Sequence, residues 1–212
     1  IETDGDFKKV TTHGGEFKAK AVLIATGSDY KKLGIPGEQE YYGRGVHYCA
    51  TCDGAFYRDK KLVVVGGGNS AVQEAIFLTR FATKIDILVR GESMRASEVL
   101  QHELERHKDK ITVHFNAVPQ EIVAESGKVT RVVAKHAQDG SELTYNTDGV
   151  FVFIGLLPNT AFLKDSNIEL DEVGLVKTND HLETSMPGVF CAGDVRSGAT
   201  MQIASATGEG AT

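Results

Sequence analysis

The sequence predicts an α/β fold in which short buried strands alternate with helices around a parallel sheet. One observation is a series of short runs rich in Val, Ile and Leu, which are typical of buried strands, at 21–25, 62–65, 85–89, 111–115 and 150–154. The other is that two of the intervening segments, 70–81 and 97–107, are predicted helices. A β-α-β-α-β succession of this kind requires parallel strands joined by right-handed crossovers.

The other predicted elements are a hairpin, an antiparallel meander, a short strand that runs into a tight turn, and the beginning of a helix, at residues 7–18, 119–147, 188–194 and 201–212. Their turn signals are Gly14-Gly15, Ser126-Gly127 and Asp139-Gly140. The polar stretch that contains Gly34, Pro36 and Gly37 is predicted to be a linker between domains.

Composition excludes several classes of function. A net charge of −6 argues against nucleic acid or an anionic membrane as the main partner. The apolar run Val150–Leu157 is far shorter than the roughly 20 residues that span a bilayer. Three cysteines are too few, and an odd number, for a secreted disulfide scaffold, so we expect a reducing, cytoplasmic environment.

The segment Cys49-Ala50-Thr51-Cys52-Asp53 is the predicted chemical centre. A structural zinc site normally needs four Cys or His ligands, and here His47 and Cys191 would have to join a single cysteine pair. We therefore expect no metal and assign the pair to redox chemistry, although two buried, inert cysteines would give the same pattern.

The chemistry of this pair depends on thiolate formation. A Cys-x-x-Cys pair favours the thiolate when one sulfur lies at a helix N-terminus. Asp53 can deliver or remove a proton as thiol and thiolate interchange. His47 could assist the thiolate electrostatically, or serve only a structural role. Cys191 lies in an apolar strand and is expected to be buried and inert.

A predicted phosphate-binding loop, Gly66-x-Gly68-x-x-Ala71, follows one predicted strand and opens a predicted helix. The first glycine makes the turn, the second lets the backbone approach a pyrophosphate, and the small third residue lets helix and strand pack closely. Backbone N–H groups at the start of the helix, around Asn69 and Ser70, favour an anion. A tight strand–helix turn without a ligand is the alternative interpretation.

Two arginines follow the next predicted strand. An NAD-binding unit usually has an acidic residue about 20 residues beyond the glycine loop. Here the strand ends at Arg90, with Arg95 shortly after, and an arginine can pair with a 2′-phosphate. The sequence therefore favours NADPH, unless these arginines are simply solvated surface residues.

Together these residues resemble the low-molecular-weight thioredoxin reductases. The resemblance covers almost the whole chain and is carried by Gly43–Val46, Cys49–Gly54, Val65–Ala71, Ile154-Gly155, Pro158–Thr160 and Ala192–Asp194. It implies a two-dinucleotide-binding-domain flavoprotein, with a Rossmann-like NADPH domain at 41–149 inserted into an incomplete FAD domain at 1–40 and 150–212. It also implies a homodimer that reduces thioredoxin or a similar small dithiol protein.

The resemblance further implies roles for individual residues. Cys52 would face the flavin, Cys49 would attack the disulfide of the partner, and Asp53 would be the acid and base. NADPH would bind at Gly66–Ala71, Arg90 and Arg95. The other implied cofactor-binding residues, mainly for FAD, are Thr26, Gly27, Gly155, Gly193, Asp194, Gln202 and Ile203.

Three departures from the family pattern accompany the resemblance. The usual His-Arg-Arg is here Val89-Arg90-Gly91, so one phosphate-binding arginine is absent and cofactor preference could change. Met201 stands where an arginine usually precedes the flavin-contacting glutamine. The sequence also contains one glycine-rich nucleotide loop where the family has two, so we expect a fragment that lacks the first FAD-binding βαβ unit and the extreme C-terminus.

Other interpretations share this architecture. One is a relative with a different partner, such as the flavoprotein component of alkyl hydroperoxide reductase, a ferredoxin-linked reductase or a dithiol oxidase. Another is a non-catalytic nucleotide-binding redox module.

Because one of the two expected nucleotide loops is missing, we predict that this polypeptide alone binds FAD poorly and has little reductase activity. The measurement is flavin absorbance of the purified polypeptide, combined with an assay of NADPH-dependent thioredoxin reduction. Stoichiometric flavin together with thioredoxin reduction would contradict the prediction.

Overall fold

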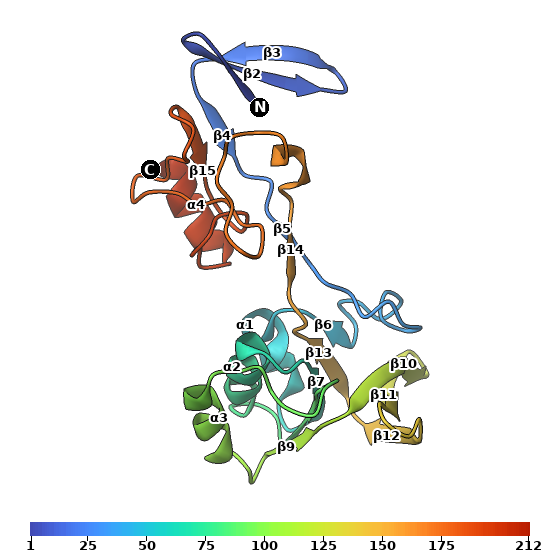
Figure 1. Ribbon diagram of the computed structural model, residues 1–212. Coiled ribbons are helices and arrows are strands. Elements are labelled where there is room, and N and C mark those ends of the chain that lie inside the picture. Colours follow the sequence, from blue (N-terminus) through green and yellow to red (C-terminus); the bar gives the residue numbers. More distant parts are fainter. The chain divides into compact units, whose positions relative to one another are not determined.

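A computed structural model describes residues 1–212 of the chain (Figure 1). Several of its strands pair with strands that are far away in the sequence. Residues 1–29 and 156–212 form one unit, and residues 30–155 form the other. Residues 30–40 therefore belong to the second unit, where the Pro36 carbonyl accepts a hydrogen bond from the Ile122 N–H at 3.0 Å. This segment, which its glycines and proline predict to be a linker between domains, packs against the second unit.

The second unit is built on a five-stranded sheet with the order β6-β13-β7-β8-β9, in which all neighbours are parallel. The strands are β6 (Val46–His47), β7 (Lys61–Val65), β8 (Lys84–Leu88), β9 (Ile111–His114) and β13 (Gly149–Val152). The parallel β-α-β-α-β unit predicted from the sequence is thus confirmed. The late strand β13 lies between the two earliest strands of the sheet, β6 and β7.

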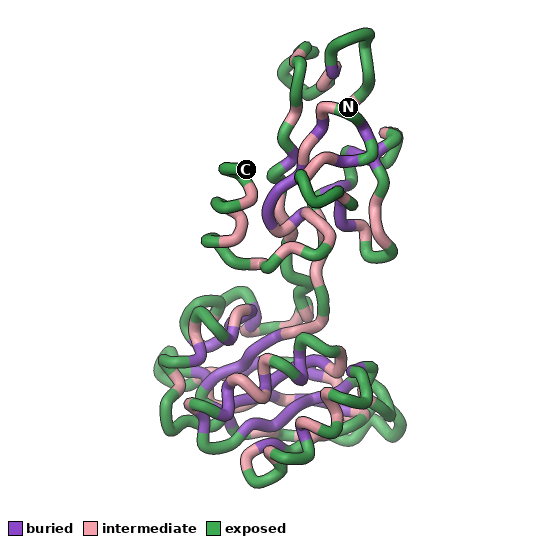
Figure 2. Tube along the Cα trace, turned by 90° about the vertical axis from the view of Figure 1, so that its left-hand side faces the viewer, coloured by how far each residue is buried: buried purple, intermediate pink, exposed green.

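Alternate side chains of β7 explain why the sheet is covered on both faces. Leu62 and Val64 pack with α2 (Asn69–Leu78) and α3 (Glu98–Glu105), whereas Val63 and Val65 pack on the opposite side. There the meander β10 (Ala117–Glu125), β11 (Lys128–His136) and β12 (Glu142–Asn146) covers the sheet. Figure 2 shows the buried segments concentrated along the central strands of this unit.

Helix α2 ends at Leu78, three residues earlier than the sequence predicts. The Thr79 hydroxyl donates to the Ile76 carbonyl at 2.7 Å, and the N–H groups of Arg80 and Phe81 bond three residues back. These short-range bonds tighten the chain into turns, so that the Phe81 carbonyl can accept a bond from the Asp59 N–H.

The first unit contains three small sheets. The predicted hairpin is confirmed as β2 (Phe7–Thr12) and β3 (Gly15–Ala19), with β1 (Glu2–Asp4) alongside β2. The other two sheets pair β4 (Val22–Ile24) with β15 (Val189–Cys191), and β5 (Ser28–Tyr30) with β14 (Leu156–Pro158). The predicted C-terminal helix is confirmed as α4 (Ile203–Ala211).

One expectation for this unit is wrong. The apolar run Ala21–Ala25 predicts a strand buried on both faces, but Leu23 in its centre is 55% exposed. Strand β4 pairs only with β15, and no element of the chain covers Leu23. No helix in the structure has both the length and the apolar character needed to cross a membrane.

The packing of residues 30–40 on β10 leads to a testable difference between two glycines. Gly34 and Gly37 both have positive φ, but a Cβ on Gly37 would lie 2.0 Å from the Ile122 carbonyl oxygen, whereas one on Gly34 would meet nothing within 4 Å. Gly34→Ala should cost about 1–2 kcal/mol through backbone strain alone. Gly37→Ala should cost about 1–3 kcal/mol more in urea unfolding, because the segment must also move off β10. Equal costs would show that the close approach is unimportant.

Candidate functional site

Two motifs from different parts of the sequence lie at the same edge of the sheet. Strands β6, β13 and β7 are parallel neighbours, so their carboxyl ends point the same way. Cys49 follows the end of β6, and Gly66 follows the end of β7. Ligands of open parallel sheets bind at this kind of edge. The structure therefore brings the predicted redox pair and the predicted phosphate loop to one side of one unit.

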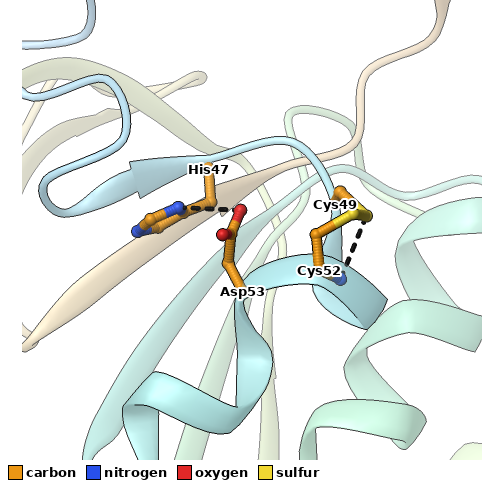
Figure 3. Close-up of a disulfide and its surroundings, with 4 residues drawn as sticks. All are labelled: His47, Cys49, Cys52 and Asp53. Carbon is orange, nitrogen blue, oxygen red and sulfur yellow. Dashed lines mark hydrogen bonds and ion pairs between the residues drawn. A yellow bond between two sulfur atoms is a disulfide. The ribbon is translucent and has the colours of Figure 1, made fainter.

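Cys49 and Cys52 form a disulfide across the start of a short helix (Figure 3). Cys49 is the N-cap of α1 (Ala50–Asp53), and its Sγ accepts a hydrogen bond from the Cys52 N–H at 3.1 Å. Cys49 is half-buried and Cys52 is exposed. A sulfur that accepts a backbone N–H at a helix start is stabilised as a thiolate, so reduction would favour a nucleophile at Cys49.

The Asp53 carboxylate pairs with His47. The His47 Nδ1 lies 3.0 Å from Asp53 Oδ2, and its Nε2 lies 2.7 Å from the Tyr57 hydroxyl, in the 3-10 turn Gly54–Tyr57 that follows α1. The sequence suggests that His47 assists the thiolate or is structural. In the structure its polar partners are instead Asp53 and Tyr57, and the role of Tyr57 has no signal in the sequence.

Burial determines the charge of His47. The residue is 5% exposed, and its ring stacks on Phe151 with centroids 5.2 Å apart. Burial lowers the pKa of His47 below its ordinary value, and the nearby Asp53 carboxylate offsets this only in part. The imidazole is therefore neutral near pH 7, with one nitrogen that donates and one that accepts.

In the glycine loop, Gly66 is closely surrounded by other atoms, whereas Gly68 has open space beside it. A Cβ on Gly66, which has φ +148°, would lie 2.3 Å from the Phe153 carbonyl oxygen and 2.9 Å from the Ala71 Cβ. A Cβ on Gly68 would meet nothing within 4 Å, and no side chain caps α2 at this N-cap position. Gly66 thus allows strand and helix to pack closely, and Gly68 leaves open space beside uncapped backbone N–H groups.

The loop after β8 is tied to the glycine loop. The N–H groups of Arg95 and Ala96 both donate to the Gly67 carbonyl, at 2.7 and 3.1 Å, and the Ser97 N–H donates to Asn69 Oδ1 at 2.8 Å. Arg95 is therefore held beside the glycine loop with its side chain exposed. Arg90 is also exposed, just beyond the end of β8. The Asn69 side-chain oxygen thus already accepts a hydrogen bond from within the chain. Ser70 is exposed and Ala71 is buried.

A second group of candidate residues lies in the unit of residues 1–29 and 156–212. The Thr26 hydroxyl donates to the Asn159 carbonyl at 2.8 Å, and the Asn159 N–H donates to the Gly27 carbonyl at 3.0 Å. The Asp194 carbonyl accepts from the Ser28 hydroxyl at 2.6 Å, while the Asp194 carboxylate has no partner. These contacts join the segment after β4 to Asn159, which follows β14, and to the turn after β15.

Four candidate residues remain, three in this unit and one in the other. Gly193 has φ +77°, and its N–H donates to Glu209 Oε2 of α4 at 2.7 Å. Gln202 and Ile203 lie at the start of α4, where no side chain caps the helix and Ile203 is 86% exposed. Gly155 belongs to the other unit, and its carbonyl accepts a bond from the Lys31 N–H.

Cys191 is separate from this chemistry. It is a fully buried free cysteine in β15, and burial raises the pKa of its thiol to about 11. A thiol of this kind stays protonated near pH 7 and is a poor nucleophile. No group of three or more His, Cys, Asp and Glu side chains is placed to hold a metal ion.

Comparison with known proteins identifies the family. The family model described as pyridine nucleotide-disulphide oxidoreductase matches residues 1–210. The chain belongs to this family. Its parallel sheet with a glycine loop and a nearby disulfide is accordingly part of a two-dinucleotide-binding-domain flavoprotein fold.

Named relatives narrow the comparison within the family. The chain is 46% identical to a thioredoxin reductase of Bacillus subtilis (strain 168), over 97% of this chain and 64% of the relative. The solved structure of thioredoxin reductase from Streptococcus pyogenes MGAS5005 is 44% identical, with a TM-score of 0.91 over 100% of this chain and 68% of that chain. The thioredoxin reductase from Giardia duodenalis is 36% identical, with a TM-score of 0.89 over 95% of this chain and 66% of that chain. The chain thus spans about two thirds of the length of these relatives.

The lowered pKa of buried His47 predicts a pH dependence of stability. Below about pH 6.5 the unfolded chain binds a proton on this residue more readily than the folded chain. The free energy of unfolding should therefore fall as pH decreases from about 6.5, with a slope of at most about 1.4 kcal/mol per pH unit from this group.

Urea unfolding between pH 5 and 8 measures this dependence. His47→Asn should remove the His47 contribution, and the same change at exposed His181 should leave the dependence as it is. An unaltered slope in His47→Asn would contradict the assignment.

Proposed function

We propose that this chain carries the disulfide-reducing centre of an NADPH- and FAD-dependent oxidoreductase that acts on thioredoxin or a similar small dithiol protein. The observation that supports it most is the common sheet edge, where the Cys49–Cys52 disulfide and the Gly66–Ala71 loop occur together. Relatives of high identity that are named thioredoxin reductase support the choice of substrate.

The residues of the glycine loop fit a dinucleotide. Gly68 provides open space for a pyrophosphate, and the uncapped start of α2 provides N–H donors. Arg95, held beside this loop, and Arg90 would pair with a 2′-phosphate, which favours NADPH over NADH. Gly91 occupies the position at which the family pattern has a second consecutive arginine, so the preference for NADPH depends on Arg90 and Arg95 alone.

The residues of the other unit fit part of a flavin site. The unpartnered Asp194 carboxylate can accept hydrogen bonds from a polyol chain, and the uncapped start of α4 at Gln202 and Ile203 offers free N–H groups. Thr26, Gly27 and Gly193 would lie on the backbone that surrounds this site. When bound, NADPH and FAD together supply the two electrons that open the Cys49–Cys52 disulfide.

The chain's own residues then carry out thiol–disulfide exchange. The Cys49 thiolate attacks one sulfur of the partner disulfide, forms a mixed disulfide and releases the other partner sulfur as a thiolate. Cys52 attacks the Cys49 sulfur, which restores the Cys49–Cys52 disulfide and releases the reduced partner. Asp53 takes the proton from the attacking thiol and returns it to the leaving sulfur.

A different disulfide partner is the second candidate. A bacillithiol disulfide reductase from Bacillus cereus shares the fold at 27% identity, with a TM-score of 0.61 over 91% of this chain. Rates with thioredoxin and with low-molecular-weight disulfides, measured on the same flavin-containing protein, distinguish the two. We also propose a cytoplasmic homodimer, on the strength of the low cysteine content and the similarity to thioredoxin reductases.

Cysteine substitutions test the proposed reaction. In the flavin-containing protein, Cys49→Ser and Cys52→Ser should each lower kcat for NADPH-dependent thioredoxin reduction by at least about 1000-fold, because no disulfide can form. Cys191→Ala, which alters a buried and inert thiol, should leave kcat within about twofold. A Cys49→Ser variant that keeps a tenth or more of the activity would contradict the proposal.

A further inference from the structure

A chain of hydrogen bonds leads from Asp53 into the interior of the unit. The Asp53 carboxylate is directed at the ring of His47 in Figure 3, and the Cys49–Cys52 disulfide lies on the other side of Asp53. His47 Nδ1 is the only side-chain partner of this carboxylate, at 3.0 Å. The opposite ring nitrogen, Nε2, lies 2.7 Å from the Tyr57 hydroxyl.

The protonation of Tyr57 and His47 follows from their surroundings. Burial raises the pKa of Tyr57 to about 12, with the Asp53 and Asp148 charges adding to it, so the hydroxyl keeps its proton. The His47 ring is neutral because burial lowers its pKa. A carboxylate accepts hydrogen bonds, so the contact with Asp53 is made when Nδ1 carries the imidazole proton. In that tautomer Nε2 is free to accept from the Tyr57 hydroxyl, so the two contacts support the same arrangement of the ring.

The ring of His47 has little freedom to turn. One face stacks on Phe151 of β13 at an interplanar angle of 28°, and the edge of the Tyr57 ring meets it at 74°. Tyr57 is itself fixed, since it packs at its edge against Phe151 and lies so close to Gly149 that a Cβ there would be 2.3 Å from its ring. The direction of the Nδ1–H donor is therefore set before any reaction begins.

Few other charged groups face this chain of contacts. Asp53 from α1 and Tyr57 from the following turn are the titratable groups in contact with His47, and Asp148, just before β13, acts on Tyr57. The side chain of Lys60 lies 3.7 Å from Asp148, and the Lys61 N–H donates to it at 2.9 Å, so the Asp148 charge is already compensated. His47 is consequently the group best placed to hold the Asp53 carboxylate.

We propose that His47, with its ring held by Tyr57 and Phe151, is a positioning residue that holds Asp53 in the orientation from which it exchanges protons with the Cys49–Cys52 pair. This inference rests on the proposed function, because it assigns Asp53 the acid–base role. In the exchange the Asp53 carboxylate takes one proton from the attacking thiol and returns it to the leaving sulfur. His47 keeps its own proton throughout and is neither oxidised nor reduced.

A reaction with a small thiol isolates this step. Dithiothreitol opens the Cys49–Cys52 disulfide and is itself oxidised to its cyclic disulfide, and the protein thiolates that leave must be protonated. The rate is followed by thiol labelling between pH 5.5 and 8.5 and corrected for the dithiothreitol thiolate fraction. The difference between the unaltered protein and Asp53→Asn measures the contribution of Asp53. The reaction needs no NADPH, flavin or thioredoxin.

Four single variants give the expected pattern. His47→Leu should lower the rate at pH 7 by about 10-fold and give the pH profile of Asp53→Asn. His47→Asn, which keeps an N–H donor near the Nδ1 position, should stay within about threefold of the unaltered protein. Tyr57→Phe removes only the hydroxyl and should lower the rate by about threefold, because Nε2 loses the hydrogen bond that helps to hold the ring.

A double-mutant cycle distinguishes a positioning role of His47 from a general contribution of His47 to the stability of the fold. If His47 acts through Asp53, then His47→Leu should have no further effect in the Asp53→Asn background. Additive losses, an unchanged pH profile in His47→Leu, or a His47→Asn variant as slow as His47→Leu would each overturn the proposal. If His47→Leu does not fold, an unchanged rate and pH profile in Tyr57→Phe would overturn it.

Failure of the positioning role and failure of the proposed function give different results. A flavin-containing protein that shows the expected cycle with dithiothreitol but no NADPH-dependent reduction of thioredoxin would retain the positioning role and lose the proposed function. A protein that reduces thioredoxin but shows additive losses would retain the function and lose the positioning role.

Discussion

The arrangement of the candidate site depends on one strand, β13, which pairs in parallel with both β6 and β7. Val150 lies opposite Val46 on one side and Val63 on the other. The strand is held at its start, where Asp148 Oδ2 accepts from the Lys61 N–H and the Gly45 carbonyl accepts from the Val150 N–H. Because this strand joins β6 to β7, the disulfide after β6 and the glycine loop after β7 share an edge.

The same strand shapes the acid–base chemistry of the site. Phe151 of β13 supplies the surface on which His47 stacks, and Gly149 leaves the space that the Tyr57 ring occupies. His47 is buried by these contacts and therefore stays neutral, and a neutral imidazole can donate to Asp53 without neutralising its charge. The sheet thus provides both the position of the disulfide and the hydrogen bond to the acid next to it.

The sequence predicts the strands with long apolar runs and the helix after the glycine loop, since hydrophobic periodicity is a local signal. It does not reveal β6, because Val46–His47 is only two residues long and is defined by its partner β13. Nor does it reveal the His47–Asp53–Tyr57 contacts, which depend on the turn after Cys49 and on Phe151, about one hundred positions away. The predicted burial of the strand around Leu23 is wrong for another reason: an apolar run does not indicate how many strands will pair with it.

Transfer of electrons from a bound nicotinamide nucleotide to the Cys49–Cys52 disulfide can be measured by anaerobic alkylation. The flavin-containing protein is labelled before and after one equivalent of NADPH, and the labelled cysteines are located by mass spectrometry. Cys49 and Cys52 should carry the label only after NADPH, and buried Cys191 should stay unlabelled in both samples. A cysteine pair that stays protected after NADPH would show that the disulfide receives no electrons from the nucleotide.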